Sequence, residues 1–371
     1  MPPDVCVLVV PRKSICHHPS ERLKESDMKW ISAASKRLPI APVQRTVAVV
    51  WCIALLASTG SGPSFSAGNE NKTKKIPVIL DTDIGDDIDD TWALTLLLKS
   101  PELDLRLVVG DQGKPLYRAS LIAKFLELAG RTDVPVGIGL GSREKEDGRQ
   151  SKWMEGYDLR SYPGTVYEDG VQAIADTIMA SSEEVTLIAI GPMPNVAAAL
   201  EREPRIAQRA RFVGMHGSVR RGYGGRAEVS AEYNVRADIK ACQKVFTAPW
   251  EMTVTPLDTC GLVRLEGEKY AKVRDSEDPI AKALIENYRI WAAVKDEAPV
   301  ADSRSSILFD TVAVYLSFAD AFLGMEDLPI RVTDDGFTAI DPTAKRMRVA
   351  TSWKDMDAFE DFLVRRLTGA R

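Results

Sequence analysis

The sequence predicts an α/β fold with one open, mostly parallel, doubly wound sheet that is flanked by helices and forms a single domain. From residue 76 onward, short apolar runs alternate with longer amphipathic stretches. This alternation is typical of consecutive βαβ units. The 45% hydrophobic and 27% charged residues match an ordinary soluble protein with a sizeable core. Open α/β sheets often form one domain of this length, so one large domain is expected.

The expected elements follow in chain order. Short apolar runs predict strands at residues 76–80, 105–109, 134–138, 185–190, 211–215 and 251–256. Stretches with apolar residues three and four positions apart predict helices at 91–99, 118–129, 170–180, 194–202 and 238–246. The remaining pattern predicts helices at 268–273, 279–294 and 310–318, strands at 330–333 and 348–351, and a closing helix at 356–367.

The first 73 residues are expected to be a leader and linker, and residues 74–371 the folded domain. An apolar run at 46–57 follows basic residues and precedes small ones, which is the order of a secretory signal. We therefore expect a periplasmic or secreted protein with no stable membrane insertion once it is processed. An uncleaved N-terminal anchor is the alternative, and Met28 is an alternative start of the signal.

Cysteine spacing and net charge exclude some classes of function. Cys6, Cys16 and Cys52 lie in the expected leader, and no two cysteines form a CxxC or zinc-like pair. Cys242 and Cys260 are either two buried thiols or one disulfide. A net charge of -5 and scattered arginines give no basic stripe, so no nucleic-acid partner is expected.

A dense group of carboxylates follows the first expected strand. Its members are Asp81, Asp83, Asp86, Asp87, Asp89 and Asp90. Carboxylates this close repel one another unless a cation neutralises some of them, and Ca²⁺ prefers such oxygen ligands. Capping of the following helix could explain one or two of these residues but not all. The segment therefore predicts a metal site at the carboxyl edge of the sheet, where open α/β sheets bind ligands.

This segment resembles the opening motif DxDxGxDDA of the inosine-uridine-preferring nucleoside hydrolase family. Asp81, Asp83 and Gly85 match it directly. The end of the motif falls on Asp89-Asp90 if Asp86-Asp87 is an insertion, and this register aligns the apolar helix that follows. Asp86 and Asp87 themselves are the alternative ligands.

Three later segments extend the resemblance along the chain. Residues 185–192 resemble the family strand whose last carbonyl, here that of Ile190, binds calcium. Residues 231–234 resemble the AEFN segment, whose Glu and Asn, here Glu232 and Asn234, hold ribose hydroxyls. Asp310 matches the remaining calcium ligand.

The resemblance implies calcium-dependent hydrolysis of the N-glycosidic bond of a small-molecule nucleoside or related N-riboside. It implies Ca²⁺ held by Asp83, Asp90, Asp310 and the Ile190 carbonyl, with Asp83 also taking the proton of the attacking water. Asp89 would bind ribose hydroxyls together with Glu232 and Asn234. We also expect a homo-oligomer, a dimer or tetramer.

Some positions depart from the family pattern. Phe309 stands where a His precedes the late Asp, so stacking on the base would replace acid catalysis. His216 is the alternative general acid, or a loop histidine with no chemical role. Arg226 and Asp111 replace Asn residues expected near the ribose, and Trp153 is either a base-stacking or a packing residue.

Two other functions remain open at this point. Asp81-Thr82-Asp83 after an apolar strand is also similar to the nucleophile motif of haloacid dehalogenase-type phosphohydrolases, although Gly85 departs from that motif. A non-catalytic calcium- and sugar-binding protein is compatible with Arg226 and Phe309.

Overall fold

The computed structural model of the chain describes residues 74–141, 147–294 and 298–369. All of them fall within one compact unit. The expected secretory signal at 46–57 and the three leader cysteines lie outside these residues.

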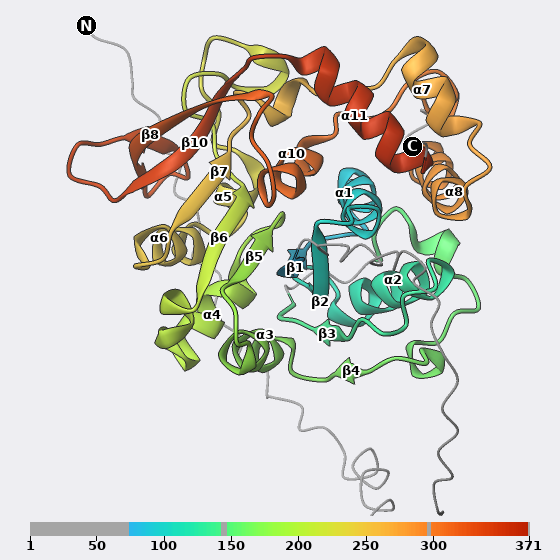
Figure 1. The fold of residues 1–371 in the computed structure, drawn as a ribbon, viewed down its shortest axis with the longest axis horizontal. Helices are drawn as coiled ribbons and strands as arrows, with labels where there is room; N and C mark the ends of the chain where they lie inside the picture. The colour runs from blue at the N-terminus through green and yellow to red at the C-terminus, as the bar shows by residue number, and fades with distance from the viewer. Residues whose placement is uncertain (1–73, 142–146, 295–297, 370–371) are drawn as a thin grey trace, which may run out of the picture. The chain divides into compact units, whose positions relative to one another are not determined.

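A ten-stranded sheet forms the centre of the described domain, in the order β4-β3-β2-β1-β5-β6-β7-β10-β8-β9 (Figure 1). The strand bounds are β1 Ile76–Thr82, β2 Leu103–Gly110, β3 Val136–Ile138, β4 Val166–Tyr167, β5 Val185–Ala189, β6 Ala210–Met215, β7 Met252–Thr255, β8 Leu323–Val332, β9 Thr338–Ile340 and β10 Arg346–Trp353. Neighbours from β4 to β10 pair in parallel, whereas β8 pairs antiparallel with both β10 and β9. The predicted α/β class with a mostly parallel sheet is confirmed.

Helices connect the strands and cover both faces of the sheet. Their bounds are α1 Asp89–Leu98, α2 Pro115–Leu128, α3 Gly170–Ala180, α4 Pro194–Arg202, α5 Tyr233–Ala237, α6 Ile239–Thr247, α7 Gly267–Arg274, α8 Pro279–Ala293, α9 Ala298–Ala301, α10 Phe309–Leu316 and α11 Met356–Thr368. Residues of α1, α2, α7, α8, α10 and α11 share one hydrophobic core, and residues of α3, α4 and α6 share the other.

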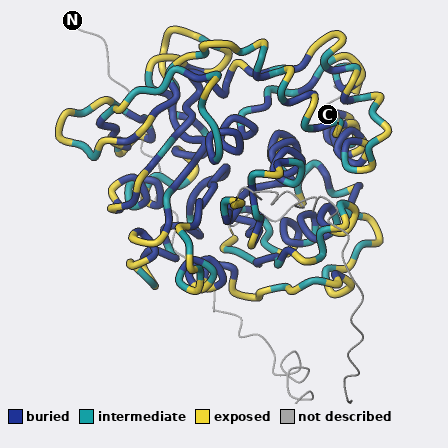
Figure 2. The backbone as a smooth tube through the Cα atoms, in the orientation of Figure 1, coloured by how far each residue is buried: buried dark blue, intermediate teal, exposed yellow. Residues whose placement is uncertain are grey.

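The pleat of β1 divides its side chains between these two cores. Val78 and Leu80 pack with the first core, while Ile79 packs with the second. Successive side chains of a strand point to opposite faces, so an uninterrupted apolar run is what a sheet covered on both sides requires. The central strands β1, β5 and β6 are correspondingly buried along most of their length, whereas the antiparallel end around β8 and β9 is more exposed (Figure 2). The doubly wound arrangement is confirmed.

The strand order creates a crevice at the carboxyl end of β1. The chain runs from β1 to β2 and β3 on one side, then returns to place β5 on the other side of β1. Connections therefore leave β1 and β5 in opposite directions, which opens a gap above their carboxyl ends. The acidic segment follows β1 directly, so the sheet places it in this crevice.

The structure corrects several element predictions. The strand expected at 330–333 is longer and begins at Leu323. The sequence did not predict its first half because Pro329 interrupts the apolar pattern, although the antiparallel end of the sheet accommodates this proline. The short elements β4, β9, α5 and α9 gave no periodic pattern long enough to predict. Cys242 and Cys260 are free and buried, so the buried-thiol alternative is right.

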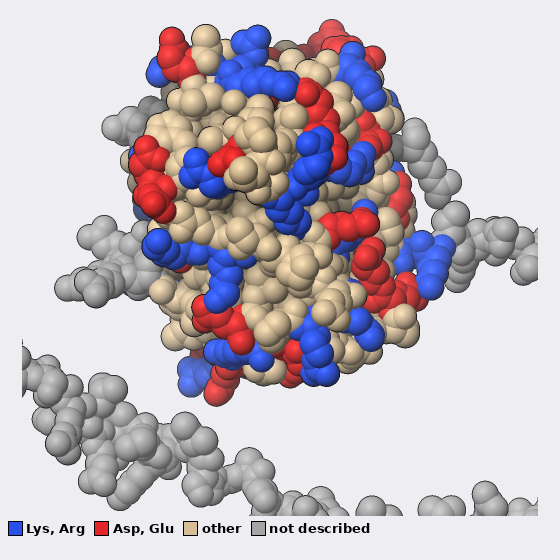
Figure 3. Space-filling view, turned by 90° about the vertical axis from the view of Figure 1, so that its left-hand side faces the viewer, with Lys and Arg blue, Asp and Glu red and all other residues tan. Residues whose placement is uncertain are grey.

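The surface of the described domain mixes both signs of charge on the face drawn in Figure 3, where basic and acidic side chains lie among one another. Among the described residues, no helix combines the length and apolar character that a membrane span requires.

The packing of Trp92 predicts a large stability effect. Trp92 of α1 is fully buried, with its ring centroid 6.5 Å from that of Tyr270 and 6.1 Å from that of Tyr288. Trp92→Ala should lower the free energy of unfolding by about 3–5 kcal/mol, because it leaves a cavity that rigid neighbours cannot fill. Leu128→Ala, at a side chain 53% exposed, should cost less than about 1 kcal/mol. Urea unfolding of both variants measures this, and equal losses would contradict it.

Candidate active site

The loop between β1 and α1 is held by close backbone contacts. Gly85 has φ +109°, a conformation that L side chains rarely adopt, and a Cβ there would collide with the ring of Tyr117. The Tyr117 hydroxyl donates a hydrogen bond to the Gly85 carbonyl at 3.1 Å. The loop therefore turns sharply, so that Asp83 before it and Asp89 after it both face the crevice.

Three buried carboxylates meet beside this loop. Asp89 and Asp90 lie in the first turn of α1, and Asp310 lies in the first turn of α10. One oxygen from each lies within 4.8 Å of the others, and the residues are only 2–4% exposed. The Thr82 hydroxyl donates to the Asp90 carboxylate and fixes its orientation. Asp86 and Asp87, the alternative ligands, are not members of this cluster, although both line the same pocket.

Burial makes the ionised form of these carboxylates unfavourable. Desolvation, followed by the charges of neighbouring carboxylates, raises the pKa of Asp89, Asp90 and Asp310 well above the usual range. Desolvation also raises the pKa of Asp83 to about 6, although the charge of Arg118 opposes the shift. Buried carboxylates that stay ionised need a cation, so the arrangement can hold a metal through hard oxygen donors.

Arg118 is a buried cation that interacts with the charges of this acidic region. Its guanidinium donates to the carbonyls of Asp83, Ile84 and Gln112, the last two at 2.8 and 3.1 Å. It thus supports the loop backbone and contributes positive charge, without using the carboxylate oxygens as acceptors.

Glu232 and Asn234 form the opposite wall of the crevice. The Glu232 carboxylate caps α5 by accepting from the Asn234 N–H at 2.8 Å, and it also accepts from the Gly217 N–H at 3.0 Å. The Asn234 amide donates to the carbonyls of Ile190 and Met215 at 3.1 and 3.0 Å. Burial raises the pKa of Glu232 to about 7.

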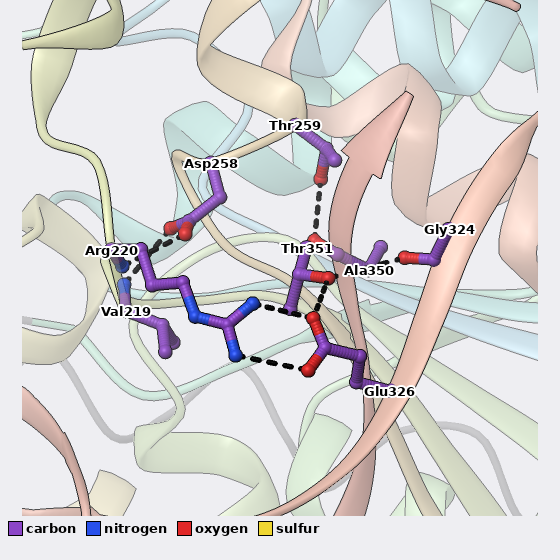
Figure 4. Close-up of polar contacts among 8 residues, drawn as sticks. All are labelled: Val219, Arg220, Asp258, Thr259, Gly324, Glu326, Ala350 and Thr351. Carbon is purple, nitrogen blue, oxygen red and sulfur yellow. Dashed lines mark hydrogen bonds and ion pairs between the residues drawn. The ribbon is translucent and has the colours of Figure 1, made fainter. Parts of the chain in front are cut away.

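A polar network anchors the loop that leads to Glu232 (Figure 4). The Asp258 carboxylate accepts from the backbone N–H groups of Val219 and Arg220 at 2.9 and 2.8 Å. The Arg220 guanidinium forms a two-pronged ion pair with Glu326 of β8, and Thr351 of β10 donates to the same carboxylate at 2.5 Å. The loop is therefore tied to the antiparallel end of the sheet.

These walls enclose a pocket of about 260 Å³. Its lining residues are Asp83, Asp86, Asp87, Asp89, Asp90, Arg149, Ile190, Met215, Tyr223, Glu232, Tyr233, Asn234, Phe309 and Asp310. All the expected metal ligands, their alternates, and the expected ribose-binding residues Asp89, Glu232 and Asn234 line this one pocket. Asp83 lines it too, but it lies outside the tight cluster of three carboxylates.

Two lining residues that the sequence reasoning missed are notable. Tyr223 packs edge-to-face against Phe309, with ring centroids 6.2 Å apart and planes at 83°. Its hydroxyl accepts from the Tyr233 N–H at 2.9 Å. Tyr223 lies within the glycine-rich run 222–225, and an aromatic residue in such a loop could have been predicted to bind a substrate. No sequence pattern indicates a place for Arg149 in the site.

His216 is not among the lining residues of the pocket. It is 1% exposed, its Nε2 lies 3.0 Å from the Gly191 carbonyl oxygen, and its ring packs against Phe212 and Phe246. Burial lowers its pKa to about 4. The ring is therefore neutral near pH 7 and faces the core rather than the crevice.

Three other expected site residues also lie outside the pocket lining. Asp111 is fully buried behind Asp83, next to Gly191, where a Cβ would come within 2.7 Å of Asp111 Oδ1. Trp153 is buried against Phe125, so the structure places it as a packing residue. The Arg226 side chain is exposed.

Comparison with known proteins matches this chain to one family. The profile of the family described as inosine-uridine preferring nucleoside hydrolase matches residues 78–361. The chain is 31% identical over 226 residues to the non-specific ribonucleoside hydrolase RihC of Klebsiella pneumoniae, covering 58% of this chain and 73% of that protein. It is 29% identical over 221 residues to the pyrimidine-specific ribonucleoside hydrolase RihA of Escherichia coli, covering 57% of this chain and 70% of that protein.

Solved structures share the fold. A plant nucleoside hydrolase, the PpNRh1 enzyme, superimposes with a TM-score of 0.68 at 22% identity, covering 80% of this chain and 99% of that chain. The purine-preferring ribonucleoside hydrolase from Gardnerella vaginalis gives a TM-score of 0.64 at 23% identity, covering 79% of this chain and 98% of that chain.

The burial of His216 predicts its titration. Because the folded state disfavours the protonated ring, unfolding takes up a proton, and this histidine removes stability as the pH falls from about 6.5 towards 4. In an NMR titration of the whole chain, the ring signal that disappears in His216→Asn should not shift between pH 8 and about 5. A midpoint near 6.5 would show instead that the ring is exposed to solvent.

Proposed function

The chain belongs to the inosine-uridine preferring nucleoside hydrolase family, and we propose that it hydrolyses the N-glycosidic bond of ribonucleosides with the help of a bound calcium ion. As a member of this family it is an N-glycosyl hydrolase. The products of the proposed reaction are ribose and the free base.

The convergence of Asp89, Asp90 and Asp310 beside Asp83 is the observation that carries this proposal. These residues come from two helices far apart in the sequence, yet their carboxylates meet in one pocket at the carboxyl edge of the sheet. Glu232 and Asn234 line the same pocket. The carboxylate cluster can hold a metal ion that activates a water, and the hydrogen-bonding side chains beside it can bind the two hydroxyls of a ribose.

The donor set supports calcium as the ion. Asp90, Asp310, Asp83 and the carbonyl of Ile190 all line the pocket and offer only oxygen ligands. Oxygen donors without nitrogen or sulfur favour Ca²⁺ over zinc. When bound, such an ion lowers the pKa of a coordinated water and orients the sugar hydroxyls.

The side chains of the protein supply the remaining steps. Asp83 accepts the proton of the attacking water. Asp89, Glu232 and Asn234 bind the ribose hydroxyls. Binding energy from the sugar then favours the oxocarbenium-like geometry of the transition state.

An aromatic pair supports stacking as the means of holding the base. Phe309 and Tyr223 contact each other at the pocket wall, whereas His216 lies outside it. A stacked aromatic ring contributes about 1 kcal/mol beyond the area that it buries. The larger ring of a purine gains more from this contact than a pyrimidine does.

The phosphohydrolase alternative is not favoured. Its nucleophile would be Asp81, but this side chain is fully buried, accepts from Asn195 at 2.8 Å and does not line the pocket. A calcium- and sugar-binding protein without catalysis differs from a hydrolase by its lack of ribose release, so an activity assay separates the two.

We also propose where the protein is located and that it forms an oligomer. The apolar run at 46–57 supports a signal peptide and a periplasmic or secreted location. We further propose that the protein acts as a homo-oligomer. Fractionation of expressing cells tests the first idea, and light scattering of the purified chain tests the second.

Removal of the metal should abolish activity. With inosine and uridine as substrates, ribose release should stop on treatment with a chelator and return with added Ca²⁺ but not Zn²⁺. Asp310→Asn should weaken calcium binding at least about 100-fold in calorimetry, because it removes a buried ligand. Asp302→Asn, at a carboxylate 64% exposed that pairs with Arg289, is the matched control and should bind as the wild type does. Full activity after chelation would exclude a metal-dependent mechanism.

Loss of the proposed base should separate catalysis from binding. Asp83→Asn should lower kcat by about 10²- to 10⁴-fold, because it removes the proposed acceptor of the water's proton. The same variant should keep its thermal stability. Calcium binding needs to be measured alongside, because Asp83 is also a proposed ligand. A near-wild-type kcat would assign the base elsewhere.

A further inference from the structure

Arg149 is the one cationic side chain among the described residues that line the pocket. The other charged lining residues are the carboxylates named above. An arginine among carboxylates reduces the repulsion between their charges, recognises an anionic group of the substrate, or does both. The surroundings of Arg149 favour recognition of the substrate.

The backbone of Arg149 is fixed by its two neighbours. Gly148 packs directly on the acidic loop, where a Cβ would collide with the carbonyl of Gly85. The buried Gln150 amide donates to the Thr91 hydroxyl of α1 at 2.8 Å and to Asn287 of α8 at 3.0 Å. Arg149 therefore stands at a defined place beside the proposed metal site.

The side chain of Arg149 is supported from one side by an aromatic ring. Its guanidinium carbon lies 5.2 Å from the centroid of the Trp291 ring, and the Trp291 indole N–H donates to the Asp86 carbonyl at 2.8 Å. The contact with this ring is the interaction described for the guanidinium, which pairs with no carboxylate of the described residues. Stacking on a ring leaves the in-plane N–H donors of a guanidinium free to meet a ligand.

The chemistry of the proposed reaction requires such a group. When the N-glycosidic bond breaks, its electron pair goes to the base nitrogen, and negative charge develops on the leaving base. The carboxylates of the pocket oppose that charge. His216 does not line the pocket and is neutral near pH 7, so it supplies neither a proton nor a positive charge there.

We propose that Arg149 binds the departing base and stabilises its negative charge, a role that rests on the proposed nucleoside hydrolysis. The substrates it suits are ribosides whose base presents hydrogen-bond acceptors and leaves as an anion, such as hypoxanthine or uracil. A guanidinium stays protonated, so it transfers no proton. The water loses one proton to Asp83 and its hydroxide forms the new bond to the sugar carbon, while the released base takes a proton from solvent.

The position of Arg149 in the sheet order agrees with this role. Arg149 follows β3 on one side of β1, whereas Glu232 and Asn234 follow β6 on the other side. Residues from both sides of β1 therefore line the one pocket, so a riboside bound there can contact Arg149 as well as Glu232 and Asn234.

Leaving-group dependence tests the assignment. Arg149→Gln should lower kcat/KM for inosine and uridine by about 10²-fold, the typical effect of losing a donor that acts on developing charge. The loss on nitrophenyl riboside should stay below about threefold, because nitrophenolate leaves readily without help. Arg149→Lys should recover part of the rate, since it keeps the charge but not the planar fork.

The control is Arg160→Gln, at a side chain 89% exposed that pairs with Asp158, and it should behave as the wild type on every substrate. Equal losses of Arg149→Gln on activated and natural substrates would overturn the proposal, because a merely structural residue acts in that way. A wild type that prefers inosine 5′-monophosphate, with the loss confined to that nucleotide, would overturn it in favour of a phosphate anchor. A wild type inactive on every riboside would reject the proposed function itself, and the role of Arg149 with it.

Discussion

The desolvation of carboxylates at the carboxyl end of β1 is the constraint on which the rest of the site depends. Asp89, Asp90 and Asp310 are too buried and too close to remain ionised together without positive charge nearby. Among the described residues, Arg118 supplies positive charge nearby, but its guanidinium donates to backbone carbonyls and not to these carboxylates. The cluster therefore differs from a set of internal ion pairs, and its oxygens suit a metal ion.

The N-termini of two helices, α1 and α10, reduce the electrostatic cost of placing these carboxylates together. Asp89 and Asp90 occupy the first turn of α1, and Asp310 occupies the first turn of α10. The N-terminus of a helix carries partial positive charge and unpaired N–H groups, and both favour carboxylates. Helix α10 comes from the far end of the chain and packs with α1 in the same hydrophobic core, so the cluster forms only when these two distant segments meet.

Sequence patterns predicted the parts of the site that depend on local order. The apolar run before Asp81 predicted strand β1, and the family motif pointed to Asp89, Asp90 and Asp310, which the structure brings together. The orientation of His216 is harder to predict, because successive side chains of a strand point to opposite faces of the sheet and an error of one residue reverses the face. Its N–H still bonds to the Thr255 carbonyl at 3.3 Å, so the pleat continues beyond β6 and turns the ring away from the side where Met215 lines the pocket. Arg149 could not be found from sequence, because its position depends on the contacts of its neighbours with α1 and α8.

Among the described residues, the pocket lining combines several carboxylates with one cationic side chain, Arg149, and Trp291 contacts both the acidic loop and Arg149. Trp291 holds the acidic loop through the Asp86 carbonyl, and its ring lies beneath the Arg149 guanidinium. Gly148 packs on the same loop at Gly85. A displacement of the acidic loop would therefore move the Arg149 side chain as well, so the proposed metal end and the proposed base-binding end of the pocket are coupled through Trp291 and Gly148.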